Sequence, residues 1–291
     1  MQNRTVLLLL LLIPSLGLAG LVLLYPLYDV IHMSFSEVNR FGQVRGLIGI
    51  SNFRDVFADP IFWIAARNTC YWVLGIVAGT ILVSLPVAII LNQEFAGRSV
   101  ARTLVMLPWS VSLSMIAIVW LWALDGEIGY VGKLLSDLGL GSLYGHWLSK
   151  PDTAFVVMIL IGIFVSIPFT VTVLLGGLSS LPDDVYEAAA LEGASSWYAF
   201  RKITRPLLMP FVEIVVVLNV INVFNSFPII WIMTAGGPSD RTHILVTYLY
   251  QLAFRLGEIG KASAISLIML SILLVLVVVY VRIVTKGRSD A

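Results

Sequence analysis

Three asparagines and a serine interrupt one of the most apolar stretches of the chain. They are Asn219, Asn222, Asn225 and Ser226, within the run from Leu207 to Met233. At about 100° per residue on a helix, the three asparagines cover about 120° of arc and form one wall. Side-chain amides supply both the hydrogen-bond donors and the acceptors that a polar solute needs. This wall is a candidate substrate path, while hydrogen bonds between neighbouring helices explain the same pattern equally well.

An acidic residue, Glu213, lies in the same run but does not belong to the wall. It is about 180° from Asn222 on a helix, so the two side chains cannot face one cavity. Ionisable groups within apolar segments are costly and are functional candidates by default. We expect Glu213 to act as an ion-pair or gating residue, with Arg282 as its suggested partner.

Motifs for covalent or hydrolytic chemistry do not occur in the sequence. A P-loop requires G-x-x-x-x-G-K-[ST], so that backbone amides can cradle phosphates. "GEIGYVGKLL" has Glu127 in place of the first glycine, and "RLGEIGKAS" has Arg255 there. HExxH and GxSxG patterns are missing, the three histidines are scattered, and Cys70 is the single cysteine. We predict a protein that is not an enzyme and that binds no cofactor or metal of its own.

A charged segment, "EAAALEGASSWYAFRKITRP", separates two apolar stretches. The pattern S-x-x-D from Ser180 to Asp183 is typical of a capping box and predicts a helix that begins near Leu181. Gly193 suits the C-cap of that helix, at positive φ. Ser195 or Ser196 then caps a second helix, and Pro206 ends it or begins the next span.

The second helix of this segment is amphipathic. Trp197, Phe200 and Ile203 recur every third residue and form an apolar stripe, and Arg201 lies off it together with the other basic residues. Three interpretations are open: the helix lies flat on the lipid surface, packs against its own bundle, or inserts into a groove on a partner.

Composition and hydropathy identify a polytopic membrane protein. The 291 residues are 59% hydrophobic and 12% charged, against about 25% charged in soluble domains. The formal net charge of +1 gives no footprint for nucleic acid. A span needs about 20 apolar residues, and six runs qualify. These are Val6 to Phe35, Asn68 to Leu91, Thr103 to Leu124, Ala154 to Leu178, Leu207 to Met233 and Ala262 to Val281.

The predicted fold class is therefore all-α, with six transmembrane helices and both termini on one side. The opening run continues through "LVLLYPLY", which makes it long enough to span, so we interpret it as a span and not as a cleaved signal peptide. The 18 Lys and Arg divide equally between the two sides. Because the segments on the side of the termini are shorter and hold their charges near the span ends, we expect cytoplasmic termini and three long external loops.

The charged segment resembles the EAA loop of bacterial ABC importer permeases. The matching pattern is E-A-A, two residues, an acidic residue and Gly-Ala, followed by the stripe and by Pro206 and Pro210. "YPLYDVIHMSF", "NFRDVFADPIFWIAARNT", "FNSFPIIWIMTAGGPSDRTHILVTYLYQLAF" and "GKASAIS" resemble the maltose- and glycerol-phosphate-type permeases, in the subunit with the Gly-Gly-Pro loop. The resemblance covers nearly the whole chain. It departs at Glu192, where aspartate is commoner, and at Arg205, where an apolar residue usually stands.

This resemblance implies a type I ABC importer transmembrane domain in the bacterial cell membrane. The chain would be the permease subunit of a solute-binding-protein-dependent importer of a sugar or related polyol. Its partners would be a second homologous permease, two ATPase subunits that bind ATP and Mg²⁺, and an extracytoplasmic solute-binding protein. The residues implied for ATPase coupling are Glu187, Ala188, Ala189, Glu192, Gly193, Trp197, Phe200 and Arg201, and those implied for binding-protein contact are Gly236, Gly237 and Pro238.

The expected organisation is a first helix and external loop in residues 1–65, the importer domain in 66–284 with the coupling loop at about 181–206, and a cytoplasmic tail in 285–291. Two other classes of protein were weighed against this one. A secondary transporter or channel usually shows several intramembrane acids and inverted repeats, which are not visible here. An integral membrane enzyme would need a catalytic constellation, and the sequence offers none.

Overall fold

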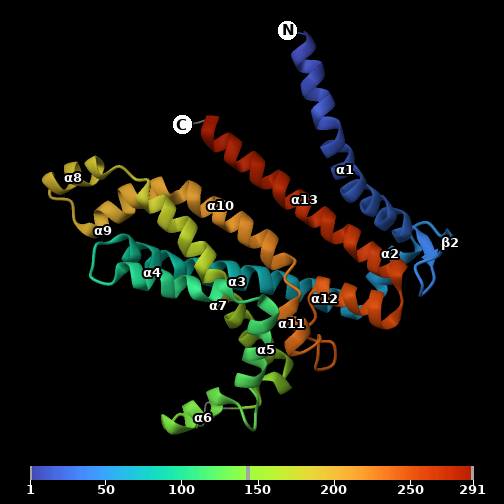
Figure 1. Ribbon diagram of the computed structural model, residues 1–291. Helices are drawn as coiled ribbons and strands as arrows, with labels where there is room; N and C mark the ends of the chain where they lie inside the picture. Colours follow the sequence, from blue (N-terminus) through green and yellow to red (C-terminus); the bar gives the residue numbers. More distant parts are fainter. Residues whose placement is uncertain (1, 142–144, 290–291) are drawn as a thin grey trace. The chain divides into compact units, whose positions relative to one another are not determined.

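A computed structural model describes residues 2–141 and 145–289 and consists almost entirely of helices (Figure 1). The chain forms two compact units. Unit 1 combines the two ends of the chain, residues 1–63 and 248–291, and unit 2 contains residues 64–247. The predicted domain boundary after residue 65 lies close to residue 63, where the first part of unit 1 ends. Residues 248–284 were predicted in the importer domain but cluster with unit 1.

Unit 1 contains the N-terminal helix, a small hairpin and the C-terminal helix. Its elements are α1 (Gln2–Ser34), β1 (Ser36–Val38), β2 (Val44–Leu47), α2 (Ser51–Ala58), η5 (Gln251–Leu256) and α13 (Ile259–Ser289). The strands pair antiparallel, with Ser36 opposite Leu47. Asn52 is buried beside them, and its amide donates to the carbonyl oxygens of Ser34 and Ser36 at 3.0 and 2.9 Å. The all-α prediction is therefore wrong at this hairpin.

The hairpin forms because "NRFG" supplies its own turn chemistry. The side-chain oxygen of Asn39 accepts from the backbone N–H groups of Phe41 and Gln43, and Gly42 has φ +80°. Asparagine and glycine favour such turns, since one bonds its own backbone and the other tolerates positive φ. Only an external loop was predicted here, and the hairpin was missed.

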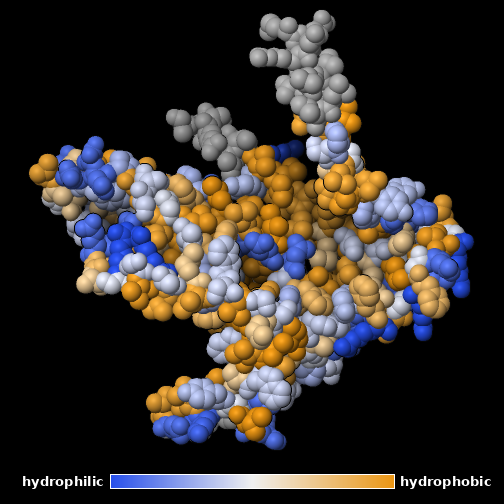
Figure 2. All heavy atoms as spheres, viewed as in Figure 1, coloured by the Kyte–Doolittle hydropathy of each residue, from blue (hydrophilic) through white to orange (hydrophobic). Residues whose placement is uncertain are grey.

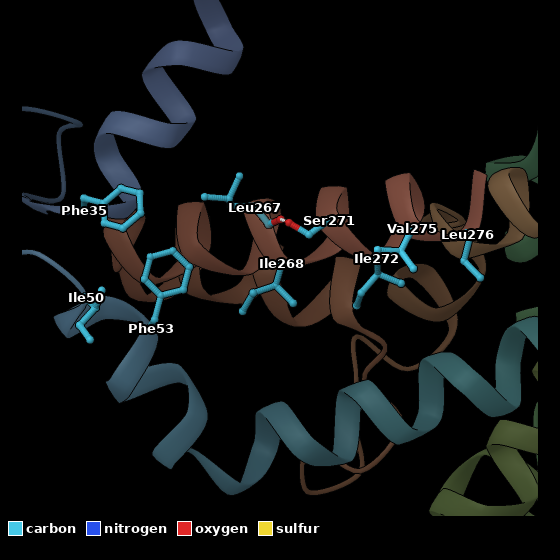
Figure 3. Close-up of a pocket in the computed structure, with 9 residues that line it drawn as sticks. All are labelled: Phe35, Ile50, Phe53, Leu267, Ile268, Ser271, Ile272, Val275 and Leu276. Carbon is cyan, nitrogen blue, oxygen red and sulfur yellow. Dashed lines mark hydrogen bonds between the residues drawn. The ribbon is translucent and has the colours of Figure 1, made fainter. Parts of the chain in front are cut away.

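A groove in unit 1 runs along α13 and has a volume of about 650 Å³. Figure 3 shows Phe35, Ile50 and Phe53 on one side and α13 residues on the other. Ser271 is the single polar side chain in a lining that also includes Leu267, Ile268, Ile272, Val275 and Leu276. Such a surface suits contact with lipid tails or with another apolar helix.

Unit 2 is a bundle around α3 (Pro60–Asn92), which enters it from unit 1. The other elements are α4 (Arg98–Met106), η1 (Leu107–Ser110), α5 (Leu113–Ala123), α6 (Tyr130–Asp137), η3 (Trp147–Ser149), α7 (Pro151–Ser179), α8 (Asp183–Leu191), α9 (Ser196–Ala199), η4 (Phe200–Thr204), α10 (Arg205–Phe224), α11 (Pro228–Met233) and α12 (Leu245–Tyr250), which continues into unit 1.

Small residues bring α3 and α7 close together in unit 2. A Cβ on Gly162 would lie 2.3 Å from the side chain of Ile76, and one on Gly79 would lie 2.4 Å from that of Ile163. Helices in a membrane gain no hydrophobic free energy from association, so close backbone approach and van der Waals packing hold them. The buried cluster around this contact includes Trp72, Met158, Ile161 and Ile230.

Among the described residues, five helices are long and apolar enough to cross a membrane, or six if the bent pair of helical segments Arg98–Ser110 and Leu113–Ala123 counts as one span. That pair bends by 93°. The third span was predicted as one continuous run from Thr103 to Leu124, whereas the structure breaks it at this bend. The second span begins at Pro60, eight residues earlier than its predicted start at Asn68, because proline is well tolerated in the first turn of a helix.

The last helix is longer than predicted. α13 continues through Ser289, so most of the expected tail at 285–291 is helical, and residues 290 and 291 lie outside the described part of the chain. Its apolar portion, Ile259–Arg282, contains the sixth predicted span.

Candidate functional site

The charged segment forms two short helices that meet at Gly193. α8 ends with Glu192 as its C-cap, and Gly193 follows at φ +76°. The N–H of Gly193 donates to the carbonyl of Ala190 at 3.0 Å, and that of Ala194 donates to the carbonyl of Ala189 at 2.9 Å. These two bonds define a Schellman motif, which requires a residue that tolerates positive φ. The predicted turn and its glycine are confirmed.

The predicted capping box is wrong. Pro182 occupies the N-cap of α8 and makes no capping bond, and α8 begins at Asp183. The hydroxyl of Ser180 instead donates to the carbonyl of Gly177 at 2.7 Å, at the end of α7. Because a proline disfavours helical geometry in the residue before it, Leu181 cannot start the helix.

The second helix of the segment continues directly into the fifth span. Ser195 is the N-cap of α9, and its hydroxyl accepts from the N–H of Tyr198 at 3.3 Å. The π-helical turn η4 then joins α9 to α10, with Pro206 in the first turn of α10. Tyr186 of α8 contacts the hydroxyl of Thr204 at 2.9 Å. Tyr186 thus links α8 to the start of α10, and sequence reasoning missed it.

Several apolar side chains on this segment are exposed among charged ones. Leu191 is 90% exposed and Trp197 is 70% exposed, and the ring of Trp197 stacks on that of Phe200 at 5.7 Å. Glu187 and Arg201 are exposed beside them. Figure 2 shows hydrophilic side chains gathered over α8 and α9, with hydrophobic ones between them. We name this surface, residues 183–204, the coupling surface, after the role that the sequence resemblance implies for it. It combines exposed apolar side chains with charged side chains around them, as protein interfaces do.

A cavity of about 330 Å³ lies in unit 2. Asn219, Asn222 and Ser226 line it, whereas Asn225 is not among its lining residues. The amide of Asn225 donates to the carbonyl of Ile221 on its own helix at 2.9 Å. The remaining lining residues are Trp72, Ile76, Trp109, Leu113, Gly162, Val165, Ser166, Phe169, Val223 and Ile229.

The two asparagines of the cavity differ in their surroundings. Asn219 is buried, and its amide donates to the hydroxyl of Thr170 on α7 at 2.9 Å. Asn219 therefore makes the interhelical bond that was weighed against a substrate contact, although it also lines the cavity. Asn222 is exposed, and no side chain in the described part of the chain hydrogen-bonds it. Its donors and acceptor are available to a solute.

Aromatic side chains complete the cavity, and the sequence prediction did not include them. Trp109 packs near Phe169 with ring centroids 6.0 Å apart, and the indole N–H of Trp72 donates to the carbonyl of Val223 at 3.1 Å. Trp109 lies in η1, beside the 93° bend. Irregular backbone in an apolar span is tolerated where it lines a cavity, so the "LPWSVS" break was the available signal.

The Gly-Gly-Pro loop follows α11 and forms a tight turn. Gly236 has φ +88°, and a Cβ there would lie 2.0 Å from the imidazole of His243. Gly237 donates its N–H to the carbonyl of Thr234 at 2.8 Å, and Pro238 follows it. Ser239 and Arg241 are exposed on the outer rim. We name residues 234–242 the external turn, after the side of the membrane that the sequence predicts for it.

The coupling surface and the external turn lie beyond opposite ends of one continuous element. α10 has 20 residues, so it is about 30 Å long, close to the hydrocarbon thickness of a bilayer. If α10 crosses the membrane, the two surfaces face opposite sides of it. Glu213 is half-buried on this helix in unit 2, while Arg282 belongs to unit 1, and their pairing stays a prediction.

The loop after α5 holds a polar pocket of about 440 Å³. The carboxylate of Asp125 accepts from the N–H groups of Ile128 and Glu127 at 3.0 and 2.9 Å. These two backbone donors lower the pKa of Asp125, with a smaller contribution from the nearby His146. The carboxylate serves its own loop, and no metal-binding group of histidine, cysteine or acidic residues occurs in the described ranges.

Comparison with solved structures gives the class of fold. A chain from the crystal structure of a bacterial ABC transporter involved in the import of the acidic polysaccharide alginate has a TM-score of 0.83, with 23% identity and 98% and 96% of the two chains covered. The alginate transporter in complex with its pentasaccharide-bound periplasmic protein gives a TM-score of 0.81 at 24% identity, with 96% and 93% covered. The fold is that of an ABC importer membrane subunit.

Sequence comparison gives the family. Residues 73–288 match the family model described as "Binding-protein-dependent transport system inner membrane component". A probable ABC transporter permease protein of Brucella suis biovar 1 is 56% identical, with 100% of both chains covered. The trehalose/maltose transport system permease protein of Thermococcus litoralis is 31% identical, covering 97% of this chain and 94% of that protein. The chain therefore belongs to this family of inner-membrane ABC transporter permeases and is a multi-pass membrane protein.

Proposed function

We propose that this chain is one permease subunit of an ATP-driven, solute-binding-protein-dependent importer of a sugar or related polyol. The observation that carries the proposal is the cavity in unit 2, where Asn222 and Ser226 face the same space as Trp72 and Trp109. The names of two relatives agree with it, since one is a trehalose/maltose permease and one is a sulfoquinovosyl glycerol permease of Agrobacterium fabrum, 31% identical over 94% of this chain.

The chemistry of the cavity suits a sugar in transit. Amide and hydroxyl groups exchange hydrogen bonds with sugar hydroxyls, and aromatic faces pack against the apolar faces of sugar rings. The volume of about 330 Å³ lies at the lower end of the range for small-molecule sites. No charged side chain lines the cavity within the described residues. A neutral polyhydroxylated solute is the class of substrate that this lining favours.

Energy input is proposed to occur at the coupling surface. Leu191 and Trp197 would insert into a cleft of an ATPase subunit, with Glu187 and Arg201 in polar contact around them. ATP and Mg²⁺ would bind the ATPase subunits and not this chain. Because α9 continues through η4 into α10, a displacement of α9 would move the helix that carries Asn219 and Asn222. This continuity gives a mechanical route from ATP hydrolysis to the cavity.

Substrate delivery is proposed to occur at the external turn. Gly237 and Pro238 would contact an extracytoplasmic solute-binding protein that brings the sugar to the cavity, whereas Gly236, which is buried beside His243, would shape the turn. A second homologous permease would complete the translocation path, and two ATPase subunits would complete the assembly. The coupling surface would then be cytoplasmic, because α10 separates it from the external turn. With six spans, both termini would lie on the same side as the coupling surface.

Reconstitution tests this function. The chain, co-expressed with its neighbouring permease and ATPase genes, is purified and placed in liposomes with ATP inside and the solute-binding protein outside. We expect uptake of a radiolabelled sugar that requires both ATP and the binding protein. Uptake that persists without an ATPase subunit and follows an ion gradient would instead support a secondary transporter.

A further inference from the structure

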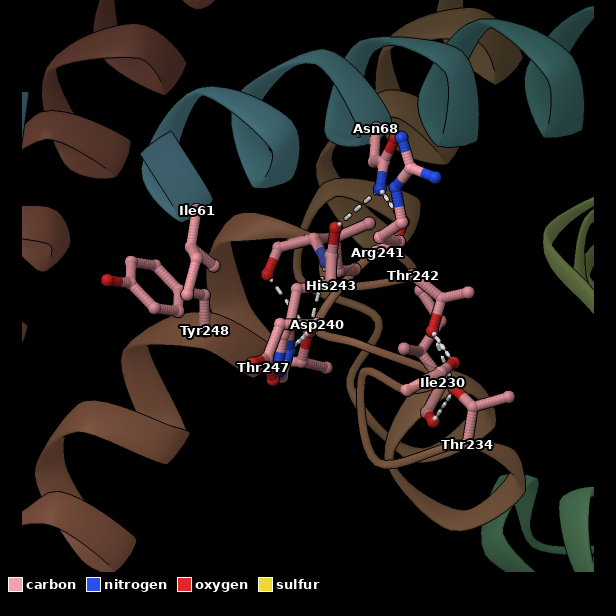
Figure 4. A network of polar contacts seen from close by, with 12 residues as sticks. Ile61, Asn68, Ile230, Thr234, Asp240, Arg241, Thr242, His243, Thr247 and Tyr248 are labelled. Carbon is pink, nitrogen blue, oxygen red and sulfur yellow. Dashed lines mark hydrogen bonds and ion pairs between the residues drawn. The ribbon is translucent and has the colours of Figure 1, made fainter. Parts of the chain in front are cut away.

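Two neighbouring side chains of α3 hold the external turn and the residues after it. Asn68 is buried, and its amide donates to the carbonyl oxygens of Arg241 at 2.8 Å and His243 at 3.0 Å. Thr69 is also buried, and its hydroxyl accepts from the N–H of Leu245 at 2.9 Å. Figure 4 shows Asn68 pointing from α3 toward this segment. Hydrogen bonds from α3 thus hold every second residue of this segment, namely Arg241, His243 and Leu245.

A second set of contacts closes the turn on itself. His243 is fully buried, with Nδ1 3.1 Å from the hydroxyl of Thr247 and Nε2 3.3 Å from a carboxylate oxygen of Asp240. The N–H of Thr242 donates to the carbonyl of Gly236 at 2.9 Å. The imidazole fills the space where a Cβ of Gly236 would lie, so the backbone of the turn packs directly against the ring.

The backbone of the turn needs such support. Ala235, Ser239 and Asp240 have φ values of 50°, 56° and 56°. Residues with a side chain rarely adopt this region, and they remain there where surrounding contacts determine the conformation. Asn68 reaches the turn from α3 through the carbonyl of Arg241 and fixes the carbonyl of His243 just after the turn, and the hydroxyl of Thr234 has a weaker contact with the sulfur of Met158 at 3.9 Å.

We propose that Asn68, assisted by Thr69, is a positioning residue for docking of the solute-binding protein. The pair would hold the external turn in the one shape that the partner meets, without touching the partner, because both side chains are buried while Ser239 and Arg241 form the exposed rim. This inference rests on the proposed role of the turn in binding-protein contact. Trp72, one helical turn further along α3, lines the cavity, so the same helix supports both regions.

The test uses Asn68→Asp in the complete reconstituted complex. The carboxylate keeps the size of the side chain but replaces the donor with an oxygen that faces two carbonyl oxygens. We expect the concentration of solute-binding protein that gives half-maximal ATPase stimulation to rise about tenfold, the effect of losing one buried hydrogen-bonding partner. The maximal stimulated rate at saturating binding protein is retained, because the coupling surface is intact. Asn92→Asp, at the other end of α3, is the matched control and changes neither value.

A second readout follows the turn itself. In a Cys70→Ala background, Ser239→Cys is labelled with a membrane-impermeant maleimide, with and without Asn68→Asp. Faster labelling together with weaker stimulation supports the inference. Unchanged labelling and unchanged stimulation overturn it and leave the proposed function standing. Faster labelling with unchanged stimulation shows that Asn68 holds the turn but that the turn is not the docking surface, which contradicts that part of the proposed function.

A second pair of variants covers the case in which Asn68→Asp does not assemble. Thr69→Val removes the hydroxyl that accepts from Leu245 and keeps the branched shape, whereas Thr69→Ser keeps the hydroxyl. We expect Thr69→Val to raise the half-maximal concentration several-fold and Thr69→Ser to leave it near the original value. Equal behaviour of the two variants would overturn the inference.

Discussion

The coupling surface and the external turn both depend on a glycine at positive φ, but for different reasons. At Gly193, a Cβ would meet nothing within 4 Å, so only the φ of +76° requires glycine. At Gly236, both the φ of +88° and the imidazole 2.0 Å away exclude a side chain. The first turn is held by its own backbone and by Tyr186, whereas the second is built around a buried ring and held by α3.

This difference reflects what each surface does in the proposed mechanism. A segment that inserts into a partner benefits from exposed anchors, and Leu191 and Trp197 are exposed. A surface that meets a separate, diffusing protein benefits from a fixed shape, since ordering a loop on binding reduces affinity. The coupling surface is therefore expected to tolerate changes that the external turn does not.

The largest effect is expected for Gly236→Ala. The methyl group would collide with the imidazole of His243 and would also occupy a strained φ, at a combined cost of about 3 kcal/mol or more. We expect uptake per assembled complex to fall at least about tenfold. Adding His243→Ala to the same chain makes room for the methyl group and should restore part of the uptake. A double variant no better than Gly236→Ala would contradict the packing explanation.

Gly193→Val should have the next largest effect. Space is available for the side chain, but a β-branched residue is strained at φ +76°. The angle between α8 and α9 should change while the spans remain in the membrane, so uptake falls although expression is normal. Gly193→Asn is the matched control, because asparagine tolerates this region better. Equal uptake by wild type and Gly193→Val, at equal expression, would refute the role of the turn.

Asn222→Leu tests the helix that joins the two regions. Removal of an amide that meets a sugar hydroxyl costs about 1 to 3 kcal/mol, so transport should fall roughly five- to a hundredfold. Stimulation of the ATPase by the loaded binding protein should persist, because the coupling surface is unchanged. Asn225→Leu is the control, since that amide bonds its own helix outside the cavity. Equal losses in both variants would argue against a substrate contact.

Two smaller effects are expected where the structure shows hydrogen bonds within the protein. Asn219→Leu breaks the hydrogen bond to Thr170. A typical interhelical bond contributes about 0.6 kcal/mol, so the amount of assembled complex should fall slightly. Tyr186→Phe removes the contact with Thr204 at a cost of about 1 kcal/mol and should lower the amount of sugar imported per ATP hydrolysed. Measuring the amount of assembled complex and, in proteoliposomes, the sugar imported per ATP hydrolysed separates assembly from coupling. An unchanged ratio in Tyr186→Phe would show that the backbone turn alone holds the helices.

Local signals in the sequence predicted the turn between α8 and α9 well. Gly193 and Ser195 act on neighbours in the chain, so their roles as C′ glycine and N-cap can be predicted from order alone. The capping-box prediction was wrong because Pro182 occupies the N-cap position of α8, while the hydroxyl of Ser180 bonds the carbonyl of Gly177 at the end of α7. Tyr186 and Leu191 were missed, since their significance lies in a contact and an exposure that appear only after folding.

The external turn and the cavity depend on contacts between distant parts of the chain. Asn68 and His243 are 175 positions apart, and no periodicity or turn rule connects them. Trp109 and Trp72 both line the cavity, and Trp109 lies beside the 93° bend of the third span, a break that a hydropathy average hides. The asparagine wall was predicted from helical geometry, but helix ends and neighbouring helices decide which asparagine faces the cavity.

In the proposed mechanism α10 joins two surfaces on opposite sides of the membrane, and thiol labelling can locate each of them. In a Cys70→Ala background, Ser239→Cys and Ser196→Cys are treated in intact cells with a membrane-impermeant maleimide and then in inverted vesicles. We expect Ser239→Cys to react in intact cells and Ser196→Cys to react only in inverted vesicles. Reaction of both thiols from the same side, or with the sides exchanged, would contradict the account.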